Sequence, residues 1–81
     1  MENVKVLVVE DESSIRKFIN INLERSGFEV IEAESGEEGL KKLVECSPEV
    51  VVLDIMLPGI DGFEVCRRIR EEKSDAVVIM L

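Results

Sequence analysis

Residues 50–62 read VVVLDIMLPGIDG, and their pattern indicates the class of fold. Its first four residues are all apolar, a pattern that predicts a strand buried on both faces, as in a parallel sheet. The strand ends on Asp54, and Pro58-Gly59 breaks the chain before a helix starts near Asp61. A carboxylate therefore follows a buried strand and precedes a loop.

Further strands and helices are predicted outward from this stretch. The strands are 4–9, 28–33 and 76–81, and helices start at 11–14, at 35–36 and at Asp61, the last running to about Lys73. Asp11 is read as part of the first helix start, and Gly27 as its end. The order β-α-β-α-β-α-β with right-handed crossovers predicts an α/β fold, a doubly wound parallel sheet. Apolar residues at helical spacing are expected to face that sheet: Ile15, Phe18, Ile19, Leu23, Leu40, Leu43, Val44, Phe63, Cys66 and Ile69.

Composition excludes several classes of protein. The 81 residues suit one small domain, and the net charge of -8 would repel a nucleic-acid backbone. No apolar run approaches the roughly 20 residues that cross a bilayer, and Met1 is not followed by a secretory signal, so a cytoplasmic protein without a membrane partner is expected. The chain has two cysteines and no histidine, which argues against a zinc site.

Three acids form the candidate site. Glu10-Asp11 and Asp54 both follow buried strands, and ligands of open α/β sheets gather at such strand ends. If the two strands are neighbours, the three carboxylates meet and repel one another unless a cation lies among them. An all-oxygen set suits Mg²⁺, to which Met56 could add its backbone carbonyl. Asp54 is the best placed to attack phosphorus, whereas Glu10 and Asp11 could equally serve as helix caps.

Two segments, VLVVEDE at 6–12 and VVVLDIMLPGIDGFE at 50–64, resemble the receiver domains of bacterial response regulators. The resemblance implies a flavodoxin-like sheet with strand order 2-1-3-4, in a module that is a phosphoacceptor rather than an enzyme. Asp54 would take a phosphoryl group from a sensor histidine kinase. Mg²⁺ would be held by Asp11, by Glu10 in place of the more usual Asp, by Asp54 and by the Met56 carbonyl. Pro58 and Gly62 resemble the residues that shape the neighbouring loop.

The sequence departs from the family pattern at its C-terminal end. Receivers place a Ser or Thr after the fourth strand and a Lys after a fifth, and neither is present here, so residues 1–81 are read as the N-terminal portion of one receiver domain. The loop sequence further resembles receivers that precede winged-helix DNA-binding domains, which suggests a transcription regulator. The fourth strand and the sheet faces of the first and third strands would be uncovered, so self-association is expected.

Three alternatives remain open from the residues alone. A haloacid-dehalogenase-like phosphohydrolase also uses a strand-end Asp, but it needs a second Asp where this chain has Met56. A nucleotide-binding module is disfavoured because acids, rather than a glycine-rich turn, follow the first strand. The third alternative is an interaction module with an inert site.

Overall fold

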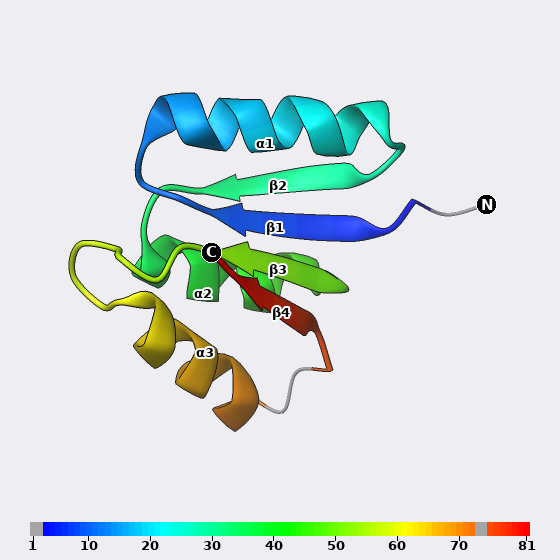
Figure 1. Ribbon diagram of the computed structural model, residues 1–81. Helices are drawn as coiled ribbons and strands as arrows, with labels where there is room; N and C mark the ends of the chain where they lie inside the picture. Colours follow the sequence, from blue (N-terminus) through cyan, green and yellow to red (C-terminus); the bar gives the residue numbers. More distant parts are fainter. Residues whose placement is uncertain (1–2, 73–74) are drawn as a thin grey trace.

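The computed structural model describes residues 3–72 and 75–81, and these residues form one four-stranded parallel sheet with three helices (Figure 1). The strand order is β2-β1-β3-β4, which confirms the predicted topology. In chain order the elements are β1 (Lys5–Val9), α1 (Ser13–Arg25), β2 (Glu29–Ala33), α2 (Gly36–Cys46), β3 (Val50–Leu53), α3 (Gly62–Glu71) and β4 (Val77–Met80). The predicted end of the third helix at Lys73 lies outside the described residues.

One face of the sheet carries the core. Every second strand residue points toward α2 and α3, and in this set Leu7, Val51 and Leu53 are 0–1% exposed. The helices contribute Leu43, Val65 and Ile69 to the same cluster. This close packing fixes β1 and β3 side by side, with Leu7 paired to Val51 and Val9 to Leu53.

The opposite face is covered only over β1 and β2, where α1 packs. Val6 and Val8 are buried there, but Val77 and Ile79 of β4 are 58% and 48% exposed. The expectation that β1 would be uncovered is therefore wrong, because α1 lies over that strand. On this face of the sheet, the apolar surface that remains exposed belongs to β4 and, in part, to β3.

Each helix begins at a side-chain cap. Glu12 accepts a hydrogen bond from the Ile15 N–H, Ser35 from Glu38 and Asp61 from Glu64. The predicted role of Asp11 in starting α1 is wrong, since Glu12 holds the N-cap position. Gly27 follows the helix end with φ +91°, a conformation that glycine adopts without strain. Because Glu12 caps the helix, the Asp11 side chain is available for other contacts.

The helix faces differ from the predicted stripes in one respect. Four residues expected to face inward are exposed: Ile15 (49%), Phe18 (70%), Val44 (67%) and Phe63 (63%). On α1 the reason is that Asn20 is buried and Arg16 nearly so, which turns Phe18 outward. None of the helices in the described part of the chain is long and apolar enough to cross a membrane.

Candidate functional site

Three carboxylates meet at the carboxyl ends of β1 and β3. The pairing of Val9 with Leu53 places the residues that follow these strands next to each other. One carboxylate oxygen from each of Glu10, Asp11 and Asp54 lies within 4.8 Å of the other two. The predicted meeting of these acids is confirmed, and the cause is the direct adjacency of the two strands.

Glu10 is the buried member of the group, with 4% of its surface exposed. Burial raises the pKa of its carboxyl group above the usual value, and the neighbouring Asp11 and Asp54 raise that pKa further. The Glu12 N–H, which donates to Glu10 Oε2 at 3.1 Å, acts in the opposite direction. A cation among the carboxylates would offset both the cost of burying the Glu10 charge and the repulsion by its neighbours.

The loop after β3 holds Asp54 in place. The Met56 N–H donates to Asp54 Oδ1 at 3.2 Å, and the Gly62 N–H donates to the Ile55 carbonyl at 2.9 Å. A Cβ atom at Gly62 would lie 2.5 Å from the Asp54 carbonyl oxygen, so only glycine fits at this closure. Pro58 is exposed at the turn of the loop, and Met56 is 83% exposed beside the acids.

Arg16 was missed by the sequence analysis. Its Nη1 donates to the Glu10 carbonyl at 2.8 Å, its Nε donates to Glu32 Oε1 at 3.1 Å, and its Nη2 lies 3.5 Å from Glu34 Oε1. Its spacing in the sequence could have indicated an inward-facing position. Arg16 lies three residues before Ile19 and four before Asn20, so the three share the inner face of α1.

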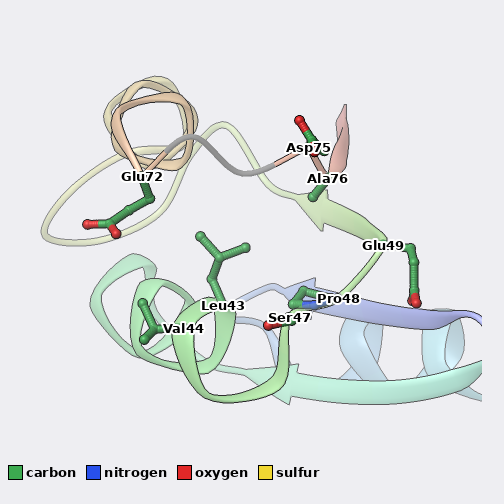
Figure 2. Close-up of a pocket in the computed structure, with 8 residues that line it drawn as sticks. All are labelled: Leu43, Val44, Ser47, Pro48, Glu49, Glu72, Asp75 and Ala76. Carbon is green, nitrogen blue, oxygen red and sulfur yellow. The ribbon is translucent and has the colours of Figure 1, made fainter.

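A pocket of about 470 Å³ lies at the other end of β3, away from the acids (Figure 2). Figure 2 shows its lining residues: Leu43, Val44, Ser47, Pro48, Glu49, Glu72, Asp75 and Ala76. One of its carboxylates is already engaged, since Glu49 Oε2 accepts a hydrogen bond from the Lys5 N–H at 2.6 Å. The grouped carboxylates of Glu10, Asp11 and Asp54 lie at the opposite strand ends.

Comparison with known proteins identifies the family. The profile of the response regulator receiver domain matches residues 6–81. The chain belongs to the response-regulator receiver family. The receiver is 51% identical over 79 residues to the alkaline phosphatase synthesis transcriptional regulatory protein PhoP of Bacillus subtilis, covering 98% of this chain and 33% of that protein. It is 53% identical over 76 residues to the transcriptional regulatory protein AfsQ1 of Streptomyces coelicolor, covering 94% of this chain and 33% of that protein.

Solved structures show the same fold. The response regulator TrrA of Thermotoga maritima, in complex with Mg²⁺ and BeF, superposes with a TM-score of 0.91 at 44% identity. The match covers 95% of this receiver and 67% of that chain. A Francisella response-regulator receiver domain gives a TM-score of 0.91 at 32% identity, covering 96% and 64%. The receiver thus spans about a third of the curated relatives and about two thirds of these solved chains.

The donor set of this receiver fits a hard divalent cation. All three side chains offer carboxylate oxygens, and the sequence contains no histidine that would favour a softer transition metal. Burial is the main cause of the raised pKa of Glu10, and the neighbouring Asp11 and Asp54 raise that pKa further. A cation among the three carboxylates would lower the cost of keeping them all ionised. The residues present are therefore suited to Mg²⁺.

Proposed function

We propose that this chain is a phosphoacceptor module in which Asp54 receives a phosphoryl group with the help of Mg²⁺. The observation that carries the proposal is the convergence of Glu10, Asp11 and Asp54 at adjacent strand ends within 4.8 Å. Family membership supports the same chemistry. The haloacid-dehalogenase alternative is not favoured, because the exposed residue two positions after Asp54 is Met56, whose side chain has no proton to donate.

Each residue has a role in this proposal. Glu10, Asp11 and Asp54 would hold Mg²⁺ through carboxylate oxygens, and Met56 would add its backbone carbonyl. When bound, Mg²⁺ neutralises charge on the phosphoryl oxygens during transfer. The Met56 N–H orients the Asp54 carboxylate through Oδ1. Pro58 and Gly62 would shape the loop that keeps this carboxylate at the strand end.

The reaction is a transfer of one phosphoryl group. A carboxylate oxygen of Asp54 forms a bond to phosphorus, while the phosphorus–nitrogen bond of a phosphohistidine on a sensor histidine kinase breaks. The imidazole leaves with the bonding electron pair, and the product is an aspartyl phosphate. The chain is consumed as acceptor in this step, so it is not a turnover enzyme.

Acetyl phosphate provides a direct test without a kinase. After incubation with Mg²⁺ and acetyl phosphate, intact-mass spectrometry is expected to find one added phosphoryl group, and peptide mapping should place it on Asp54. The Asp54→Asn variant should take up none, whereas Asp61→Asn, a change at a nearby exposed Asp, should label normally. Labelling is expected to be slow because the Ser or Thr and the Lys of the family pattern are not among these 81 residues. Full labelling of Asp54→Asn would disprove the assignment.

The proposal extends to the wider setting of the chain, which its relatives support. We propose that residues 1–81 are the N-terminal portion of one receiver domain in a cytoplasmic transcription regulator, since its relatives PhoP and AfsQ1 are transcriptional regulatory proteins. Neither nucleic acid nor a membrane would bind to this acidic segment.

We further propose that the chain self-associates through β4. This strand lies at an edge of the sheet, and its Val77 and Ile79 side chains are about half exposed. An exposed apolar edge strand favours pairing with another molecule.

A further inference from the structure

Arg16 connects three elements at the acidic end of the sheet. It belongs to α1, it donates to the main chain directly after β1, and it pairs with Glu32 of β2 and Glu34 just beyond. Its side chain is only 11% exposed, whereas those of Glu32 and Glu34 are 56% and 72% exposed. The guanidinium is therefore enclosed by the fold, and its planar donors suit several fixed acceptors at once.

The acceptor on the β1 side is the carbonyl of Glu10, a residue of the candidate metal site. The N–H of the same residue donates to the Ala33 carbonyl at 3.1 Å, and its Oε2 accepts from the Glu12 N–H at 3.1 Å. With the Arg16 bond at 2.8 Å, the Glu10 backbone is held from both sides. The position of the adjacent Asp11 depends on the same short segment.

We propose that Arg16 is a positioning residue that holds Glu10 and Asp11 in the geometry needed to bind the divalent cation. The inference rests on the proposed metal site and adds a residue that does not touch the metal. Arg16 acts by tying the end of β1 to the end of β2 through one side chain.

The direction in which Mg²⁺ affinity changes when Arg16 is replaced distinguishes a positioning role from an effect of its charge alone. A guanidinium near a cation site repels the cation, so removing the positive charge alone would tighten Mg²⁺ binding. Loss of positioning has the opposite effect, because displaced carboxylates bind the ion less well. Residues that orient metal ligands typically contribute about 10-fold to 100-fold in affinity. The positional effect is expected to exceed the effect of the charge, because the Arg16 guanidinium is already paired with Glu32 and Glu34.

The first measurement is the Mg²⁺ dissociation constant of the chain by isothermal titration calorimetry. Arg16→Met is expected to weaken binding about tenfold. Lys17→Met removes an equal charge from the next, exposed residue of α1, and it should leave binding unchanged or slightly tighter. Arg16→Lys keeps the charge and the aliphatic part of the side chain but loses the planar set of donors. Its Mg²⁺ affinity should therefore lie between those of Arg16→Met and the unmodified chain. Unchanged or tighter binding by Arg16→Met, or full affinity in Arg16→Lys, would overturn the proposal.

The second measurement needs no metal. Amide hydrogen exchange at Glu10 and Glu12 should be faster in Arg16→Met and Arg16→Lys than in the unmodified chain, because their hydrogen bonds depend on the anchored segment. The Asp54 amide, which donates to the Val9 carbonyl, should keep its exchange rate and report an intact sheet. If the unmodified chain binds no Mg²⁺, the proposed metal site fails, and exchange alone decides the role of Arg16. Unaltered exchange at both amides would refute that role.

Discussion

At the scale of single residues, the site depends as much on Gly62 as on its acids. The loop after β3 returns so closely on itself that the Gly62 N–H reaches the Ile55 carbonyl, and no side chain fits between them. The main chain of Asp54 lies directly against Gly62. The position of the Asp54 carboxylate therefore depends on residue 62 having no Cβ atom. This connection could not be derived from composition or periodicity.

Replacing Gly62 by alanine is expected to damage both stability and labelling. The new Cβ would lie 2.5 Å from the Asp54 carbonyl oxygen and 2.7 Å from Ile55 Cα, so the loop must move. Forced overpacking costs about 1–3 kcal/mol, which urea denaturation would measure. The control is Gly27→Ala, where φ is +91° but no atom lies within 4 Å of the added Cβ. That control should lose stability while labelling at the normal rate, and a Gly62→Ala variant with normal labelling would contradict the account.

The carboxylates themselves predict a response to Mg²⁺. A ligand that binds only the folded state at ten times its dissociation constant adds about 1.4 kcal/mol to the free energy of unfolding. Thermal unfolding of the chain should therefore shift upward with Mg²⁺, and the shift should disappear in Asp11→Ala. Asp75→Ala, at the opposite end of the sheet, should keep the full shift. Equal shifts in the unmodified chain and in Asp11→Ala would show that Asp11 does not bind Mg²⁺ and would contradict the proposed site.

At the scale of elements, α3 shows how one helix end is assembled. Asp61, where the sequence predicted a helix start, caps the helix by accepting from the Glu64 N–H at 2.9 Å. In a capping box the side chain at this position would accept from the N–H of the cap residue. Here the Glu64 carboxylate accepts from Arg67 and Arg68. These arginines lower the pKa of Glu64 from its ordinary value of 4.5 to about 2.

The pairing on α3 predicts a pH dependence. A carboxyl group whose pKa is depressed by folding stabilises the folded state above its ordinary pKa, and this contribution is lost as pH falls from 4.5 toward 2. The carboxyl ¹³C shift of Glu64 should titrate near pH 2, and in Arg67→Gln/Arg68→Gln its midpoint should move back toward 4.5. A midpoint that is the same in both proteins would show that the arginines do not cause the shift.

The cap of α3 supports a separate prediction. Asp61→Ala removes the acceptor of the Glu64 N–H and is expected to cost about 1 kcal/mol of stability in urea denaturation. Asp61→Asn keeps an oxygen acceptor and serves as the control, with a much smaller loss. Equal losses in the two variants would indicate that the charge at this helix start matters more than the hydrogen bond.

At the scale of the whole molecule, the two faces of the sheet are covered unequally. The face under α2 and α3 is packed across all four strands, whereas α1 covers only the β1 and β2 half of the other face. Figure 1 shows α1 on the β2 side of the sheet and β4 at the far edge. Val77 and Ile79 are left as the exposed apolar side of an edge strand.

The exposed side of β4 should make the chain associate with itself. Light scattering at micromolar concentration is expected to find dimers or larger species, and Ile79→Lys should shift them toward monomer because a charge blocks edge pairing. Val44→Lys is the matched control, since Val44 is 67% exposed on α2 over the other sheet face. A cooperatively unfolding, purely monomeric chain would refute this expectation.

The order of elements, the parallel sheet and the three acids could be predicted from the sequence alone, because continuous apolar runs and the residues after them are local signals. Even the meeting of Glu10 and Asp11 with Asp54 followed once β1 and β3 were taken as neighbours. The inner side of α1, by contrast, could be identified only from the packed fold. Buried Asn20 and enclosed Arg16 displaced Phe18 outward, since their partners and packing come from other elements. The Arg16 contacts span residues far apart in the chain, and only the fold brings such groups together.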